Sequence, residues 1–195
     1  MYILQRPDEA AVQAKLAYDL DPLNPIILIT YSAALLCADD YETAMIHAEK
    51  ALEMDPESFL ANNQVGEVAF RCRDYDKALE KLKLDLQVYF REQFEEDALI
   101  EIDRIFQEQG YFAAFEKILT YYEVAADKGF IGPGVMAIKY IMGNQQDKAM
   151  DCLEKGYEIH DPQMPYIASG GYPFDSLYNN PRFIAILEKM NLPLP

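Results

Sequence analysis

Two histidines, His47 and His160, are the side chains of this sequence best suited to bind a metal or to transfer protons. Neither has a second ligand at a spacing such as His-Glu-x-x-His, and closely spaced cysteines that could complete a zinc site are missing. His47 falls in the middle of a helical pattern, and His160 comes just before an Asp-Pro pair that ends a helix. We therefore expect solvated or helix-end histidines and no metal site.

The cysteines do not form a nucleophilic or disulfide pattern. Cys37, Cys72 and Cys152 each fall within a helical pattern, where packing is the default role of a thiol. No Gly-x-Ser-x-Gly motif offers an alternative nucleophile. An odd, widely spaced set without a Cys-x-x-Cys pair favours reduced thiols over a disulfide framework. The sequence thus predicts a reducing, cytoplasmic location and no nucleophilic catalysis.

Carboxylates are abundant, but they stand where solvation explains them. Asp39 and Asp40, or the acidic run 95–97, lie on hydrophilic faces or turns, whereas acid–base catalysis needs two carboxyls in contrasting environments. Gly132-Pro133-Gly134 and Gly170-Gly171 match neither phosphate-binding glycine motif. They are typical of a link between two hairpins and of a loop. We expect no catalytic, cofactor-binding or metal-binding residue, and so no enzyme.

The composition excludes further classes of partner. The 195 residues are 51% apolar, which is enough for a buried core, and carry a net charge of −16 from 33 acids and 17 bases. Such a charge repels phosphate backbones and anionic lipid surfaces, so neither nucleic acid nor a membrane is expected as a partner. A basic peptide or protein surface fits it, although an acidic surface also simply favours solubility. No apolar stretch approaches the length of a membrane span, and no secretory leader opens the chain.

The elements that carry these residues repeat along the chain. When the sequence is aligned with itself at an offset of 34 residues, several columns agree. The columns are Ala10 with Ala44 and Ala78, Asp21 with Asp55, Pro22 with Pro56, and Tyr41 with Tyr75. Amphipathic helices are predicted over 6–22, 40–56 and 74–86, and the Asp-Pro pairs end the first two. Small residues at i, i+4 and i+7 let a neighbouring helix approach; they are Ala44, Ala48 and Ala51.

This 34-residue unit resembles the tetratricopeptide repeat, in which two helices form a hairpin. Residues 25–58 resemble one repeat and 59–92 a second, which departs at Asp85 and Phe90. In the first, the matching positions are Leu28, Tyr31, Ser32, Leu35, Ala44, Ala48, Ala51 and Pro56. Residues 130–162 match again, and 93–128 form a degenerate repeat. The resemblance implies an all-α, right-handed superhelix of about four hairpins within a single domain, with no sheet.

The two ends of the chain differ in pattern. Residues 6–22 form a second helix of a repeat, a half repeat that cannot bury its apolar face alone. We expect either that the chain is cut from a longer protein or that a second copy supplies the missing neighbour. Within this chain Val12, Leu16 and Leu20, or the adjoining first-helix face of 25–36, should therefore be left partly bare. At the other end a loop is predicted over 163–180 and a capping helix over 181–191.

Residues 129–195 resemble, more narrowly, the repeat segments that follow bacterial signalling domains such as cyclases, kinases or winged-helix regulators. The matching positions are Pro173, Phe174, Asp175, Leu177, Pro181, Arg182 and Phe183, with Asn180 in place of an aspartate. This resemblance implies a C-terminal regulatory or docking arm whose function is protein–protein interaction. The alternatives are a self-associating scaffold and, less favoured, a small hydrolase on an α-solenoid, which would require a polar cleft.

The family resemblance also implies a binding groove lined by first helices of the repeats. Its positions in this sequence are Ile29, Ala33, Leu36, Leu60, Asn63, Glu67, Phe70 and Arg71, with Ile26 and Cys37 beside them. Large apolar residues at Ile29, Leu36, Leu60 and Phe70 favour a protein or peptide ligand, or else packing on a neighbouring turn. A carboxylate clamp of the co-chaperone type is not supported, because Ala33 and Glu67 stand where it needs Asn or Lys.

Overall fold

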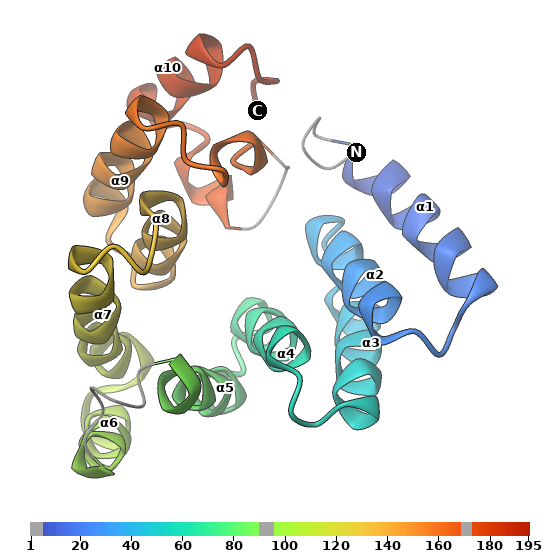
Figure 1. Cartoon of the computed structure of the whole chain (residues 1–195), viewed down its shortest axis with the longest axis horizontal. Coiled ribbons are helices and arrows are strands. Elements are labelled where there is room, and N and C mark those ends of the chain that lie inside the picture. The colour runs from blue at the N-terminus through green and yellow to red at the C-terminus, as the bar shows by residue number, and fades with distance from the viewer. Residues whose placement is uncertain (1–5, 90–95, 169–172) are drawn as a thin grey trace. The chain divides into compact units, whose positions relative to one another are not determined.

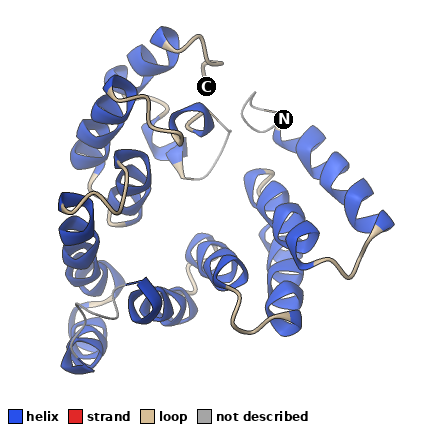
Figure 2. Cartoon of the chain, viewed as in Figure 1, coloured by secondary structure: helices blue, strands red, loops and turns tan. Residues whose placement is uncertain are grey.

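The computed structural model describes residues 6–89, 96–168 and 173–195. All regular structure in these ranges is helical, and they contain no strand (Figures 1 and 2). The α-helices are α1 (Pro7–Leu20), α2 (Pro25–Cys37), α3 (Tyr41–Met54), α4 (Phe59–Arg71), α5 (Tyr75–Tyr89), α6 (Glu96–Gln109), α7 (Tyr111–Asp127), α8 (Pro133–Met142), α9 (Gln146–Glu158) and α10 (Pro181–Lys189). The prediction of an all-α protein is confirmed.

Helices that follow one another in the sequence pack against each other. The most extensive contacts join α2 to α3, α4 to α5, and α8 to α9, which are the hairpins expected over 25–58, 59–92 and 130–162. Helix α1 packs on α2, and α3 packs on α4, so neighbouring hairpins also touch. The chain forms two compact units, an N-terminal unit of Pro7–Ile100 and a C-terminal unit made mainly of Glu101–Pro195.

The turn inside a hairpin recurs with the same geometry. Asp39, Arg73 and Asn144 follow α2, α4 and α8, and each adopts a left-handed backbone, with φ of 60°, 61° and 57°. The next amide in each turn donates back to the helix, from Asp40 to the carbonyl of Leu35 at 3.0 Å and from Asp74 to Ala69 at 2.9 Å. This bond pattern is a Schellman-type helix end. The repeat seen in the sequence is therefore also a repeat of backbone conformation.

Proline and asparagine stabilise the starts of α2 and α10. Pro25 and Pro181 each occupy the first turn of a helix, α2 and α10. The side chain of Asn24 accepts a hydrogen bond from the amide of Ile26, and that of Asn180 accepts one from Arg182. The predicted loop over 163–180 differs from expectation, because it contains two short 3-10 helices, η2 (Met164–Tyr166) and η3 (Phe174–Leu177). Met164, Phe174 and Leu177 of these helices are buried, while Gly170 and Gly171 lie outside the described residues.

The other glycine cluster is explained by a long-range cap. The carboxylate of Asp161, which follows α9, accepts a hydrogen bond from the amide of Gly134 at the start of α8, at 3.1 Å. A Cβ atom added to Gly132 would lie 2.6 Å from this carboxylate, and one added to Gly134 would lie 2.5 Å from the Cβ of Gln163. Glycine is thus required here by close approach of the chain.

Fully buried alanines set the spacing of the helices in the N-terminal unit. Ala44, Ala48 and Ala51 of α3 are each 0% exposed, as predicted from their shared face. Ala51 packs in a core cluster with Leu28 of α2 and Ala61 of α4. One small helix face therefore contacts both the preceding and the following helix.

A buried polar node ties the same three helices together. The hydroxyl of Ser32 in α2 donates to the carbonyl of Ala44 in α3 at 2.8 Å. The same hydroxyl accepts from the side-chain amide of Gln64 in α4 at 3.1 Å. Because both side chains are buried, each of these bonds also spares a desolvated polar group from being left unpaired.

His47 corrects an expectation. It is 8% exposed rather than solvated, and its ring centroid lies 4.8 Å from that of Tyr18 and 4.6 Å from that of Tyr31. Within the described residues its Nδ1 atom has no hydrogen-bond partner. The reason is tertiary, because α1 and α2 each bring a tyrosine onto α3. Burial, and next the ammonium of Lys50, lower the pKa of His47, with Asp40 acting in the opposite sense.

We expect Ala44→Leu and Ala51→Leu each to lower the free energy of unfolding by about 1–3 kcal/mol, because overpacking a filled contact forces the helices apart. Urea denaturation followed by circular dichroism measures this. Ile46→Leu on the same helix is the control, since Ile46 is 58% exposed and its substitution should change little. Melts of the two alanine variants that overlay the parent would contradict the observed packing.

The His47 cluster should make the fold acid-sensitive. A folded-state pKa below the unfolded value of about 6.5 means that the unfolded chain binds more protons, so stability falls as pH drops through that value. Comparing urea midpoints at neutral and mildly acidic pH, for the parent and for His47→Phe, measures the effect. We expect the variant to lose less stability between the two pH values than the parent. Equal losses would show that carboxylates alone cause the pH dependence.

Candidate functional site

The surface formed by α2 and α4 in the N-terminal unit is the best candidate for a binding site. These two helices contact each other directly. Each also packs against the second helix of its own hairpin, α2 against α3 and α4 against α5. A row of half-buried side chains follows each helix at a spacing of four residues. The rows are Ile29, Ala33 and Cys37 on α2, and Asn63, Glu67 and Arg71 on α4. We call these six residues the α2/α4 face.

The two rows occupy the same columns of the repeat, because 29 and 63, 33 and 67, and 37 and 71 are each 34 residues apart. The neighbouring faces of both helices carry buried core residues, such as Leu28 on α2 and Val65 on α4. The face is thus the side of each first helix that the hairpin partner leaves partly uncovered. Its α2 row is apolar or weakly polar, whereas its α4 row can donate and accept hydrogen bonds.

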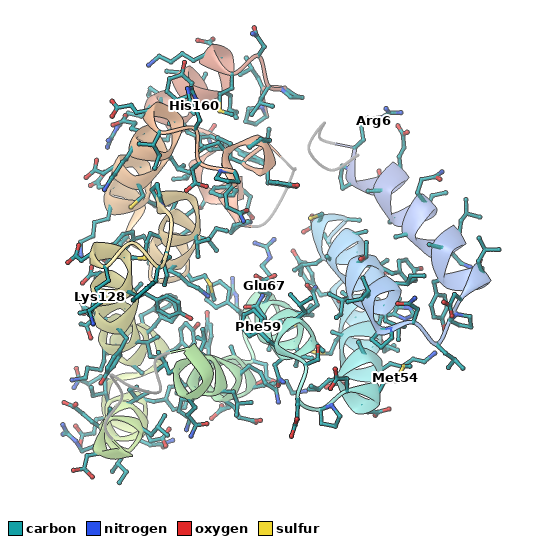
Figure 3. The ribbon with its side chains drawn as sticks, viewed as in Figure 1. Arg6, Met54, Phe59, Glu67, Lys128 and His160 are labelled. Atoms are coloured by element: carbon teal, nitrogen blue, oxygen red, sulfur yellow. The ribbon has the colours of Figure 1, made fainter. Side chains whose placement is uncertain are left out.

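The polar groups of the α4 row are already ordered by short-range bonds. The side-chain amide of Asn63 donates to a carboxylate oxygen of Glu67 at 3.2 Å. The guanidinium of Arg71 donates to the hydroxyl of Tyr41 at 2.7 Å, approaches Asp39 at 3.4 Å and stacks over the Tyr41 ring. Glu67 extends from α4 (Figure 3). These bonds fix the row before any ligand arrives, which lowers the entropic cost of binding.

The thiol of Cys37 is held neutral at one end of the face. Burial raises the pKa of this thiol to about 11, and the Glu67 carboxylate adds to the rise while Arg71 opposes it. A neutral thiol is a weak nucleophile and a poor metal ligand. Cys37 therefore contributes apolar packing surface to the face rather than reactivity.

The structure brings together most of the residues predicted for the groove. Ile29, Ala33, Asn63, Glu67 and Arg71 share the α2/α4 face. Leu36 is 3% exposed and is buried in the core, so it offers no surface to a ligand. Phe70 is half-buried, with its ring centroid 6.1 Å from that of Tyr75, and Leu60, at the start of α4, is 52% exposed.

Tyr41 and Asp39 were not among the predicted groove residues. Their position at the start of the second helix and in the turn before it gave no indication that they would meet Arg71 across 30 and 32 residues. The Tyr41–Tyr75 column of the repeat was the available clue, because it marks a ring that sits beside the first helix of the next hairpin.

Charge is distributed unevenly along the chain. Residues 7–100 contain 20 acids and 8 bases, a net charge of −12, whereas the remaining residues contribute 13 acids and 9 bases. The N-terminal unit, which carries the α2/α4 face, is therefore the strongly acidic part. Its electrostatic field favours a cationic ligand and accelerates its encounter with the surface.

The C-terminal unit has a depression of about 460 Å³ between α9 and α10. The guanidinium of Arg182 crosses it and binds Asp151 at 2.6 Å and Glu154 at 2.7 Å. Hydrogen bonding to Arg182 lowers the pKa of Glu154. These contacts hold α10 against α9, which agrees with the predicted capping helix. Because Arg182 is paired with Asp151 and Glu154, these three charged groups are already neutralised and attract a charged ligand less.

Among the described ranges there is no group of three or more His, Cys, Asp and Glu side chains that could hold a metal ion. No helix within those ranges is long and apolar enough to cross a membrane. A comparison with known protein families finds no match for this chain, and a search of curated proteins finds no relative.

Burial of the α2/α4 face predicts different reactivities for two thiols. At pH 8 a pKa of about 11 leaves roughly one Cys37 thiol in a thousand ionised, whereas Cys72 is exposed. We expect iodoacetamide to modify Cys72 several-fold faster than Cys37, as measured by mass spectrometry of peptides over time. In urea all cysteines should react alike, which controls for local sequence. Fast labelling of native Cys37 would show that this face opens.

Proposed function

We propose that the protein is a tetratricopeptide-type repeat module, a right-handed superhelix of hairpins, that binds a segment of another protein on the α2/α4 face. Hairpins that repeat in sequence columns, turn geometry and alanine contacts support this proposal. Binding on the surface shared by successive first helices follows from how such hairpins stack. No catalytic step is part of the proposal.

The observation that carries the proposal is the pairing of an apolar row with an ordered polar row at equal repeat positions. Ile29 and Ala33 form an apolar surface on α2, and the small side chain of Ala33 leaves space for a ligand side chain. Asn63 and Glu67 offer an amide and a carboxylate to the backbone or side chains of a bound segment. Such a surface suits an extended or helical peptide, and the charge of the N-terminal unit favours a basic one.

The proposal extends to the setting of the module. We infer a docking arm of a bacterial signalling protein, supported by the likeness of residues 129–195 to repeat segments of that kind and by the anchored α10 helix. A reducing compartment such as the cytoplasm fits the free thiols of Cys37, Cys72 and Cys152. A partner of this sort would dock reversibly, because the face is partly polar.

A self-associating scaffold is the second candidate. The observation in its favour is the exposure of Val12, Leu16 and Leu20 on α1, at 58%, 53% and 88%. This agrees with the expectation that these side chains are partly bare. Light scattering across a concentration series separates the two candidates, because only a scaffold predicts a mass that rises with concentration.

Selection from a displayed library of random peptides tests the proposed function. We expect the chain to enrich binders whose affinity falls at least about tenfold, or 1.4 kcal/mol, with Ala33→Arg and with the double change Asn63→Ala and Glu67→Ala. The arginine blocks the apolar surface on α2, and the double change removes the polar row. Ile46→Ser, at an exposed position of α3, is the matched control and should leave affinity unchanged.

Two results would contradict the proposed function. One is a selection that enriches no peptide for the folded chain. The other is a set of binders whose affinity is unaffected by changes in either row, because the binding would then take place elsewhere. Circular dichroism of each variant shows whether the fold is retained, so a loss of binding through unfolding is recognised.

A further inference from the structure

The turns α1–α2 and α3–α4 lie on the same edge of the N-terminal unit. Successive helices run antiparallel, so the ends of α1 and α3 and the starts of α2 and α4 point to the same side of the unit (Figure 1). The ammonium of Lys50, in α3, donates to the carbonyl of Pro22 at 3.2 Å and thereby joins α3 to the α1–α2 turn. Residues far apart in sequence therefore build one surface.

This surface carries large apolar side chains that the core does not use. They are Leu20, Leu23 and Ile26 around the first turn and Met54 beside the second, with exposures of 88%, 68%, 58% and 41%. Met54 is seen at the end of α3 in Figure 3. We call these four residues the turn edge. Contiguous exposed apolar groups with a polar rim mark interaction surfaces, because they gain free energy when a partner covers them.

The rim of the turn edge is acidic. Asp19 and Asp21 flank the first turn, and an exposed set surrounds the second, namely Glu53, Asp55 and Glu57. Lys15 pairs with Asp19 at 2.7 Å, and the ammonium of Lys50 is bound to Pro22 and to the hydroxyl of Tyr18. Among the described residues, no base pairs with the three acids of the second turn.

The opposite edge of the unit provides an internal comparison. Its turns, 38–40 and 72–74, belong to the same hairpins and are also polar, but they expose no large aliphatic side chain. A turn between two helices of this unit can therefore form without exposing leucine side chains. Of these two edges, as far as the structure describes them, the turn edge alone combines exposed large aliphatic side chains with acids.

We propose that the turn edge docks a basic amphipathic helix of a partner protein. Such a helix presents an apolar stripe to Leu20, Leu23, Ile26 and Met54, while lysine or arginine side chains beside the stripe reach the carboxylates of the rim. A β-strand partner is disfavoured, because no strand edge is available there to pair with its backbone. This surface is distinct from the α2/α4 face and does not depend on it.

A synthetic amphipathic helix of leucine and lysine is the probe. Its affinity for the chain is measured by fluorescence anisotropy at low and at physiological salt. A peptide of the same composition, shuffled so that the leucines no longer share one face, and a peptide with glutamate in place of lysine serve as controls. We expect tight, salt-sensitive binding of the amphipathic peptide and at least about tenfold weaker binding of both controls.

Variants of the chain locate the contact. Two double variants, Leu20→Ser with Leu23→Ser and Asp55→Asn with Glu57→Gln, should each lower the affinity for the amphipathic peptide at least about tenfold. Ile46→Ser and the pair Asp76→Asn with Glu80→Gln are matched controls at exposed positions away from the turn edge, and they should change affinity less than about twofold. All substitutions lie at exposed positions, and circular dichroism verifies the fold.

Three outcomes would overturn this inference. Equal binding of the amphipathic and shuffled peptides would mean only diffuse attraction to an acidic protein. Loss of peptide binding with Ala33→Arg but not with the turn-edge variants would place the peptide on the α2/α4 face and leave the proposed function standing. Self-association that Leu20→Ser with Leu23→Ser abolishes would make a second copy of the chain the occupant.

Discussion

The close approach of consecutive helices at alanine is the constraint on which the N-terminal unit depends. Ala44, Ala48 and Ala51 have no exposed surface, so α3 touches α2 and α4 without an intervening layer of side chains. Dispersion contacts at this distance are numerous, and a larger residue would break all of them together. Because the spacing is fixed here, the outward rows of α2 and α4 are also fixed.

The buried hydroxyl of Ser32 gives this packing a unique alignment. It bonds the carbonyl of Ala44 and the amide of Gln64, so α2, α3 and α4 must stand at one relative height for both bonds to form. Apolar contacts alone would tolerate sliding, whereas an unpaired buried polar group costs about 1–3 kcal/mol. This alignment also holds the Ile29–Cys37 row of α2 and the Asn63–Arg71 row of α4 in register with each other.

The two surfaces of the N-terminal unit differ in chemistry because they arise in different ways. The α2/α4 face is a by-product of stacking, half-buried and ordered by bonds such as that of Arg71 to Tyr41. The turn edge lies where helices end, and chain reversal leaves Leu20 and Leu23 without neighbours to cover them. Both share an acidic field, since residues 7–100 carry most of the net charge. Partners of like chemistry are therefore steered to either surface, and shape decides between them.

The sequence by itself determined the all-helical class, the repeat and the buried alanine face. These follow from periodicity and from local chemistry, such as the Asp-Pro pairs, which act within a few residues. The tertiary structure alone decided that His47 is enclosed by Tyr18 and Tyr31, that Leu36 is buried, and that Asp161 caps α8. It also decided that the α1–α2 and α3–α4 turns form one edge. The reason is physical: each of these features requires particular faces of different helices to meet, and a single helix pattern specifies its own apolar face but not the residues that will cover it.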